Sequence, residues 1–326
     1  MKRTLVRLLS ACCVALACAT AAAEANALTV YSVGPAPLIR RLAADFRQET
    51  GIEVNVFQGD TGQVLARLAD SNAAPADVVI LGSWDTALEM SRRGELLPYR
   101  PAGYEHIADA YRTPQFVAQG VATLALVWRV DSGTPRPADW GDLVAPAYRD
   151  RIGTVDPAQS GSTLDLISAL DAQHGIDIWA LLAALRENGL TPSGSNAQAM
   201  DAVLKGGKAA LFAVADHTAL EDKAHGAPID VIFPRSGTIA TARPMMIMKQ
   251  SQDVRDAKRF VDFVLSRKGQ QDVADEFIIP ARDDVAAARP GLDAIKLLPA
   301  PTAPADGGGG SSREAVLKRF AALFSK

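Results

Sequence analysis

Short apolar runs alternate with segments of helical spacing along most of the chain. The apolar runs predict strands over residues 28–31, 52–57, 77–81, 121–130, 152–155, 209–215, 231–233 and 244–249. Apolar side chains three and four residues apart predict helices over residues 35–50, 63–70, 86–93, 162–174, 178–188, 197–204, 253–266 and 269–277, with a short helical turn over 139–143. Strands and helices that alternate in units of about 25 to 30 residues indicate an α/β fold with mixed, mostly parallel sheets.

The C-terminal region has a different pattern. Residues 298–312 contain three prolines and the four glycines of 307–310, which is typical of a flexible surface connection without chemistry. The segment after it has an apolar stripe at helical spacing, formed by Val316, Leu317, Phe320, Leu323 and Phe324. We therefore expect residues 291–326 to form a linker and an amphipathic helix that returns to the body.

The first residues have the pattern of a secretory signal peptide. The basic side chains of Lys2, Arg3 and Arg7 precede an apolar stretch over residues 8–19 and a run rich in alanine. The stretch is shorter than the roughly 20 apolar residues that a membrane span needs. We expect a signal peptide over residues 1–27, with cleavage after Ala23 as the alternative.

The positions of the cysteines indicate the compartment of the mature protein. All three, Cys12, Cys13 and Cys18, lie inside it, so the mature chain carries no thiol. An exported chain without disulfides indicates a Gram-negative periplasmic protein stabilised by core packing. Lipid anchoring at Cys12 or Cys18 is the alternative, because residues 9–12 (LSAC) resemble a lipobox.

Composition and charge exclude several classes of protein. Among the 326 residues, 48% are hydrophobic and 22% charged, which is too apolar for a disordered chain. The net charge is -3, and removing three basic residues and Glu24 with the leader leaves 31 basic against 36 acidic side chains, or -5. An acidic balance with dispersed basic residues argues against a nucleic-acid partner.

Four strand-to-helix junctions carry the candidate chemistry. In open α/β sheets, ligands bind beyond the carboxyl ends of the strands, where helix N-termini point free N–H groups at the crevice. Glycine lets the backbone approach a ligand, and Ser or Thr adds a hydroxyl donor. The candidate anion-binding residues are Ser32, Gly34, Thr61, Gly62, Ser83, Ser160, Gly161, Ser162 and Thr163.

Ordinary helix capping is the alternative for each junction, since Ser, Thr, Asp and Gly are the preferred helix starters. Residues 160–163 are four such residues where one cap suffices, which favours binding there. Asp216 and His217 follow a predicted strand, and Thr218 with Glu221 matches a capping box, which leaves the Asp-His pair free to line a cleft.

The remaining titratable candidates point to structural roles. His174 before Gly175 suits a helix C-terminus, and His106 and His225 lie in polar loops without paired ligands. Arg243 could neutralise an anion, although a solvated or ion-paired arginine is the commoner case.

Sequence signatures of catalysis are lacking. The chain has no G-x-S-x-G, H-E-x-x-H, G-x-G-x-x-G or Walker A motif and no mature cysteine. The absence of these motifs disfavours an enzyme without excluding one, and we expect no catalytic residues, no resident metal and no cofactor.

The order of these features resembles a known family. The segments LTVYSVGPAPLIRRLAADFRQETGIEVNVFQGDTGQVLARL, ADVVILGS, DPAQSGSTLDLISAL and SGTIATARPMMIMK are similar to those of periplasmic solute-binding proteins of ABC importers. The likeness is closest to the branch that binds ferric ion, sugar phosphates and phosphonates, and it runs from about Leu28 to Arg282.

The resemblance implies a type II periplasmic-binding-protein fold with two α/β lobes and the ligand between them. Residues 117–121 and 238–243 would be the hinge crossings. Lobe 1 would comprise residues 28–120 and 245–290, and lobe 2 residues 121–244. Hinge closure around the ligand would present the closed form to an ABC permease in the inner membrane.

The resemblance also bears on the ligand. Ferric binders in this branch carry adjacent tyrosines where this chain has Asp216-His217, and all five tyrosines here precede residue 149. The expected ligand is therefore a small anionic, phosphorylated metabolite, with Asp216 and His217 contacting its organic part. The alternatives are ferric iron in a site without tyrosines, and a periplasmic sensor that partners a membrane histidine kinase. We expect a monomer.

Overall fold

A computed structural model describes residues 27–173, 175–298 and 312–325. The signal peptide, apart from Ala27, lies outside these residues, as do His174 and nearly all of the predicted flexible connection. Within the described part of the chain, no helix is long and apolar enough to cross a membrane.

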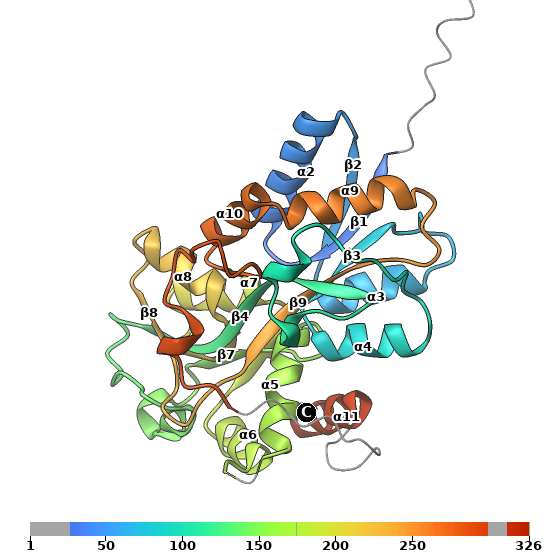
Figure 1. Ribbon diagram of the computed structural model, residues 1–326. Coiled ribbons are helices and arrows are strands. Elements are labelled where there is room, and N and C mark those ends of the chain that lie inside the picture. The colour runs from blue at the N-terminus through green and yellow to red at the C-terminus, as the bar shows by residue number, and fades with distance from the viewer. Residues whose placement is uncertain (1–26, 174, 299–311, 326) are drawn as a thin grey trace, which may run out of the picture.

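The N-terminal half of the fold is a parallel α/β unit. Strand β1 (Leu28–Val33) lies between β2 (Val54–Gly59) and β3 (Val78–Ile80) and runs parallel to both. The helices α2 (Ala36–Thr50), α3 (Thr61–Ala69) and α4 (Trp84–Arg92) each follow one of these strands. Later in the chain, α9 (Val254–Val264) and α10 (Arg267–Asp275) return to this unit, as Figure 1 shows. We call it the first lobe.

The second lobe repeats this construction. Strand β5 (Ile152–Val155) pairs in parallel with β6 (Thr191–Ser193) and β7 (Ala210–Ala215). The surrounding helices are α5 (Gly161–Asp171), α6 (Ile178–Glu187), α7 (Asn196–Leu204) and α8 (Asp216–Ala224). Short 3-10 turns lie at Tyr104–His106, Asp109–Tyr111, Trp140–Val144, Pro146–Tyr148 and Leu292–Ala294.

Two long antiparallel strands join the lobes. Strands β4 (Phe116–Arg129) and β9 (Ala240–Ile247) pair with each other, and each also pairs with strands of the outer units. Strand β8 (Ile229–Ile232) and the short β10 (Ile279–Pro280) pair with β4 as well. The register of β4 against β9 shifts between Ala118 and Val121, where the sequence predicts a hinge crossing. The two-lobed α/β fold is thus confirmed, whereas the lobe boundaries at residues 120 and 244 remain predictions.

Each lobe has its own apolar core. Leu28, Leu42 and Phe46 pack with Phe260 on one side of the first sheet. Leu164, Leu182 and Phe212 belong to the core of the second lobe. Burial of such a side chain contributes roughly 1.5–3 kcal/mol to stability. Because each lobe has its own cluster of buried side chains, the lobes are separately packed bodies that meet at the crossing strands and along one edge.

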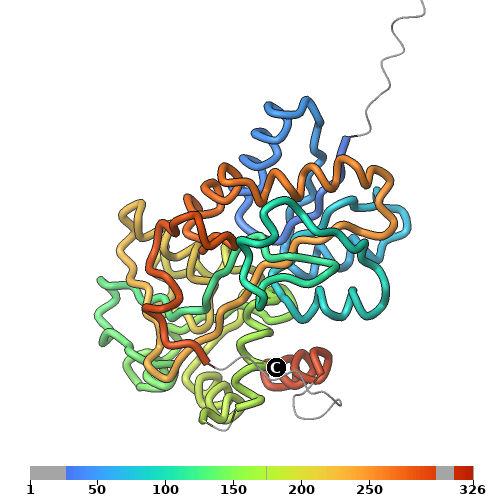
Figure 2. Tube along the Cα trace, in the orientation of Figure 1, coloured from blue at the N-terminus to red at the C-terminus, as the bar shows by residue number. Residues whose placement is uncertain are grey.

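The end of the chain crosses from the first lobe to the second. After α10, residues 276–298 run down one side of the molecule, as the red segment of Figure 2 shows, and Leu298 donates a backbone hydrogen bond to Thr238. The last helix, α11 (Arg313–Phe324), buries Val316 and Phe320 in the core of the second lobe. Figure 1 places this helix beside α5 and below α4.

Most predicted elements lie within a few residues of the observed ones. The strand predicted over residues 121–130 begins at Phe116, because the polar Gln119 and Gly120 interrupt the apolar pattern without ending the strand. The predicted capping box at Thr218 is wrong. Helix α8 begins at Asp216 with Ala215 as its N-cap, so Thr218 already lies within the first turn.

Candidate functional site

Three helix N-termini meet where the lobes touch. Asp60, Ser83 and Ser160 are the N-caps of α3, α4 and α5, and each accepts a hydrogen bond from its own first turn. A helix N-terminus attracts anions, because its first N–H groups have no partner within the helix. The structure therefore brings three of the four predicted junctions to one edge between the lobes.

Hydrogen bonds cross between the lobes at this edge. The Thr61 N–H donates to the Gln159 carbonyl at 3.1 Å, and the Gly161 N–H donates to the Thr61 hydroxyl at 3.1 Å. The Ser83 hydroxyl donates to Asp165 Oδ1 at 2.7 Å. These contacts define a closed conformation, with the two lobes in direct contact.

Glycine is required for this close approach. A Cβ atom on Gly161 would lie 2.8 Å from the Ser83 Cβ, and one on Gly62 would lie 3.3 Å from the Ala158 carbonyl. Both neighbours belong to the opposite lobe, so the two glycines allow the backbones to touch.

The serine-rich segment 160–163 has a partly structural role. Ser160 caps α5 through the Thr163 N–H at 3.3 Å, and the Thr163 hydroxyl lies 2.9 Å from Ser160 Oγ and 3.2 Å from the Ala213 carbonyl. The Ser162 hydroxyl is half-buried and lies 3.2 Å from Ser160 Oγ. Helix capping thus accounts for Ser160 and Thr163. The Ser162 hydroxyl and the backbone N–H groups at the start of α5 have fewer hydrogen bonds within the protein.

Asp165 has an unusual position at the same edge. It is half-buried, but its carboxyl group packs against the fully buried Ser83 of the other lobe. Burial and the nearby Asp85 carboxylate raise the pKa of Asp165 to about 8 against the effect of Ser83 and Arg313. A neutral Asp165 carboxyl can hold the interlobe hydrogen bond without adding a negative charge beside an anion.

Arg243 lies on the hinge side of the cleft. Its guanidinium donates to the Val33 carbonyl and, at 3.4 Å, to Gln119 on the neighbouring crossing strand. A Cβ atom at Gly34, whose φ is 146°, would lie 1.9 Å from Arg243 Nη2, so only glycine leaves room for this side chain. Burial lowers the pKa of Arg243 to about 10, which keeps the group charged at neutral pH.

The sequence-based interpretation of Arg243 as a solvated or ion-paired arginine is wrong. The residue is only 7% exposed, and no carboxylate of the described residues forms a salt bridge with it. The Ser32-Val33-Gly34 junction, whose Ser32 is buried, is instead the neighbour of this cation.

Asp216 and Arg289 form a buried ion pair in the second lobe. Their charged atoms lie 2.6 Å apart, and both side chains are fully buried. Asp216 also accepts hydrogen bonds from the N–H and hydroxyl of Thr123. Burial raises the pKa of Asp216, while Arg289 and Thr123 oppose that rise. One terminal nitrogen of Arg289 has no partner among the described residues, and the guanidinium carbon lies 5.7 Å from the centre of the Phe233 ring.

The positive charges of Arg243 and Arg289 both act on His217. It is 5% exposed, and burial, together with the charges of Arg243 and Arg289, lowers its pKa to about 3. Its imidazole is therefore neutral at physiological pH, with Nδ1 lying 3.4 Å from the Thr218 hydroxyl. The group of four titratable side chains thus carries two positive charges against one carboxylate.

The predicted residues therefore fall into two groups. Thr61, Gly62, Ser83 and residues 160–163 line the contacting edge, whereas Ser32, Gly34, Asp216 and His217 lie with Arg243 toward the hinge. Sequence reasoning missed Arg289 and Thr123. No local signal marks them, because Arg289 comes from an irregular segment and Thr123 from the middle of an apolar strand.

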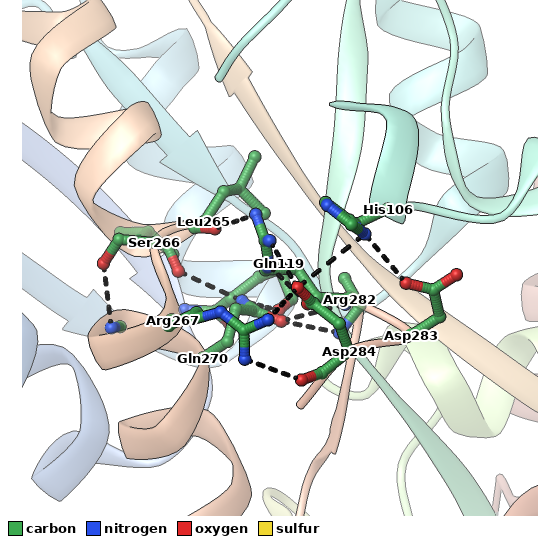
Figure 3. Close-up of polar contacts among 12 residues, drawn as sticks. His106, Gln119, Leu265, Ser266, Arg267, Gln270, Arg282, Asp283 and Asp284 are labelled. Atoms are coloured by element: carbon green, nitrogen blue, oxygen red, sulfur yellow. Dashed lines mark hydrogen bonds and ion pairs between the residues drawn. The ribbon is translucent and has the colours of Figure 1, made fainter. Parts of the chain in front are cut away.

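A second polar cluster lies outside this cleft. His106 Nδ1 lies 3.1 Å from Asp283, and the two residues form, with Asp284, the one group in the described residues with spacing suited to a metal ion. The expectation that His106 has no paired ligands is thus wrong. Figure 3 shows that Arg267 and Arg282 already bind both oxygens of Asp284, and these bonds lower its pKa to about 2.

These bonds join separate segments of the chain. Arg282 also donates to the Leu265 carbonyl, and Gln270 links Gln119 of β4 to the backbone of Ala281. The network fixes the segment after α10 against the first lobe at the start of the hinge.

The two lobes, crossing strands and interlobe edge define a protein of the periplasmic-binding-protein fold. Residues 28–276 match the family of bacterial extracellular solute-binding proteins, and the chain belongs to this family. The description of this family is the binding of extracellular solutes.

One curated relative is the phosphoglycerate transport regulatory protein PgtC of Salmonella typhimurium. It is 25% identical over 234 residues, which cover 69% of this chain and 57% of the relative. The match therefore leaves much of that longer protein uncovered.

Two solved structures share the fold. AfuA of Actinobacillus pleuropneumoniae, with fructose-6-phosphate bound, has a TM-score of 0.81 at 19% identity and covers 91% of this chain and 98% of its own. Iron-bound HitA of Pseudomonas aeruginosa has a TM-score of 0.76 at 22% identity and covers 92% and 99%. Because both identities are below 25%, the likeness concerns the fold alone. The ligand has to be inferred from the residues of the site.

Proposed function

We propose that this protein is a periplasmic solute-binding protein that captures a small phosphorylated or otherwise anionic metabolite between its lobes. It would deliver this ligand to an ABC permease in the inner membrane, as a monomer exported by its signal peptide. The observation that carries the ligand class is the surplus of buried positive charge formed by Arg243 and Arg289 with one carboxylate, Asp216.

The charge argument is energetic. An uncompensated buried guanidinium costs several kcal/mol, and an anion that enters the cleft offsets part of that cost. Among the residues that the structure describes, the buried Arg243 has no carboxylate partner, and one nitrogen of Arg289 has no acceptor. The same surplus opposes a ferric ion, which needs several anionic or basic ligands, so the iron alternative is disfavoured.

The hydroxyl-rich edge supplies the neutral donors. We assign to the anion the residues of this edge, Thr61, Gly62, Ser83, Ser160, Gly161, Ser162 and Thr163, together with Ser32 and Gly34 on the hinge side. Hydrogen bonds to a charged acceptor contribute about 1.5–3 kcal/mol each, so a few of them suffice for micromolar affinity.

We assign His217 and Asp216 to the organic part of the ligand, His217 by direct contact and Asp216 through Arg289. The oxygens of Asp216 already accept from Thr123 and Arg289 in this closed conformation. Asp216 would therefore act by holding Arg289 in place, and the neutral His217 ring would offer a hydrogen bond to a ligand hydroxyl.

Calorimetric titration of the mature protein tests this function. The panel comprises sugar phosphates, phosphonates, phosphoglycerates and ferric citrate. We expect micromolar or tighter binding of a phosphorylated compound, and a loss of about a hundredfold in Arg243→Ala, with Arg136→Ala as the control because Arg136 forms a surface ion pair with Asp230. Binding of ferric citrate alone, with a visible charge-transfer band, would contradict the proposal.

The partner requires a separate test. Reconstitution with the neighbouring permease genes should give ligand-dependent ATP hydrolysis. If the adjacent genes instead encode a histidine kinase, and ligand changes its autophosphorylation, the protein is a sensor.

A further inference from the structure

Helix α11 contains none of the residues that we assign to the binding site. Its apolar face packs on the second lobe, where Val316 and Phe320 are buried and Leu317, Leu323 and Phe324 lie against the same core. The Arg319 guanidinium stacks over the ring of Trp179, also in the second lobe, at 4.3 Å. The body of α11 is therefore fixed to the second lobe.

The first residue of α11 makes a different contact. Arg313 Nη1 donates to the Thr86 hydroxyl at 2.9 Å, and Thr86 lies in the first turn of α4 in the first lobe. Thr86 is buried, and its N–H bonds to Ser83, whose hydroxyl in turn reaches Asp165 of the second lobe. Arg313 thus reaches across the lobe boundary beside the interlobe hydrogen bond of Ser83.

The positive charge of Arg313 also acts on two carboxyl groups. Asp85 belongs to α4 and Asp165 to α5, and the Asp85 carboxylate contributes to the raised pKa of Asp165. Burial and Glu89 raise the pKa of Asp85, while Arg92 and Arg313 oppose the rise. Arg313 opposes the rise of the pKa of both Asp85 and Asp165, so its charge stabilises the ionised Asp85 carboxylate beside the closing edge.

We infer that α11 is a latch that holds the lobes closed, anchored on the second lobe through its apolar face and bound to the first through Arg313. Closure then forms the Arg313–Thr86 bond and brings the Arg313 charge close to Asp85 of the first lobe, whereas opening breaks both contacts. The latch raises the closed population in the absence of ligand and slows ligand release. This role rests on the two-lobed closure that the proposed function requires, but it is independent of the ligand's identity.

The test measures lobe separation without ligand. The mature chain has no cysteine, so Glu49→Cys in the first lobe and Glu187→Cys in the second, both at exposed positions, give a single spin-labelled pair. Pulsed electron paramagnetic resonance then reports the distribution of distances between the labels. In the parent chain we expect a narrow population at the closed distance.

Arg313→Ala should increase the open population about threefold to tenfold, because one charge-assisted bond and its electrostatic effect are lost. Lys318→Ala is the matched control, since Lys318 is an exposed cation on the same helix. Adding Asp85→Asn to Arg313→Ala removes the carboxylate that has lost this cation, and it should restore part of the closed population.

Several outcomes overturn the latch. An unchanged distance distribution in Arg313→Ala would do so, as would equal opening in Lys318→Ala, which would indicate a general effect of removing a positive charge from the helix. Circular dichroism on each variant verifies that the helix content is retained. Because no ligand is added, failure here leaves the proposed ligand class untouched, and failure of the ligand panel leaves the latch untouched.

Discussion

Asp216 and Arg289 form an ion pair of 2.6 Å between the start of α8 and the irregular segment that follows α10. Both side chains are fully buried, so neither charge is screened by water. Because the pair joins an element of the second lobe to a segment arriving from the first, it fixes the path of the chain as well as the charge of the cleft.

Breaking this pair should destabilise the protein strongly. Asp216→Asn leaves Arg289 buried without a counter-charge, and we expect a loss of about 3–5 kcal/mol in the free energy of unfolding. Asp216→Asn combined with Arg289→Met removes both charges and should recover at least half of that loss. Urea denaturation followed by circular dichroism measures both values. Equal destabilisation of the single and double variants would show that the electrostatic pairing contributes little.

His217 should make the protein sensitive to acid. Its pKa is about 3 in the folded protein against about 6.5 when unfolded, so only the unfolded state takes up this proton between those values. Stability is therefore unaffected by His217 above pH 6.5 and falls as the pH is lowered toward 3. His217→Gln should flatten this acid-side decline by about 1 kcal/mol or more between pH 6.5 and 5.

The control for His217 is His225→Gln, which changes a histidine at the C-terminus of α8. Denaturation curves of the parent and both variants at pH 7, 6 and 5 provide the comparison. An identical pH dependence in His217→Gln and the parent would contradict the buried, neutral state of this imidazole.

The sequence predicts the contacting edge well because each part of it is local. A Ser or Thr beside Gly at the end of an apolar run indicates a strand-to-helix junction, and parallel strands bring such junctions to one edge. Asp60, Ser83 and Ser160 are consequently N-caps as the residue types suggest.

The hinge side could not be derived in this way. Arg289 reaches Asp216 only because residues 276–298 follow an irregular path between the lobes, and no periodicity encodes that path. Arg243 looks like any surface arginine in the sequence, yet it occupies the space that Gly34 leaves empty. The charge surplus is a tertiary property that depends on which distant segments pack together.

Asp165 should give the opposite pH response to His217. Its pKa is about 8 in the folded protein against 3.8 unfolded, so the folded state binds the extra proton between these values. Its stabilising effect is complete below pH 3.8 and is lost as the pH rises through about 8. Asp165→Asn, which keeps an acceptor for Ser83, should raise the free energy of unfolding by about 1–2 kcal/mol at pH 9 and by much less at pH 5, after allowance for the partial exposure of Asp165.

The comparison variant is Asp142→Asn, on the 3-10 turn Trp140–Val144 of the second lobe. Urea denaturation at pH 5, 7 and 9 reports the slope for each protein. If the free energy of unfolding changed with pH in the same way in the parent protein and in Asp165→Asn, Asp165 would already be ionised at neutral pH.

Gly161 provides a direct test of whether lobe contact is needed for binding. A methyl group at this position would lie 2.8 Å from the Ser83 Cβ and 3.2 Å from its backbone nitrogen, and backbone on the opposite lobe cannot yield as a side-chain tip can. In Gly161→Ala the lobes must stay slightly apart, which lengthens the Thr61 and Ser83 hydrogen bonds that cross the edge. The folded lobes themselves are unaffected, because the clash exists only on closure.

We therefore expect Gly161→Ala to weaken binding of the best ligand in the panel by about tenfold or more, with a change of less than about 1 kcal/mol in the free energy of unfolding without ligand. Gly141→Ala is the control, since a Cβ there meets no atom within 4 Å. Calorimetric titration gives the affinity and urea denaturation the stability. Full affinity in Gly161→Ala would mean that the ligand is held with the lobes apart, and that the contacting edge serves the empty protein alone.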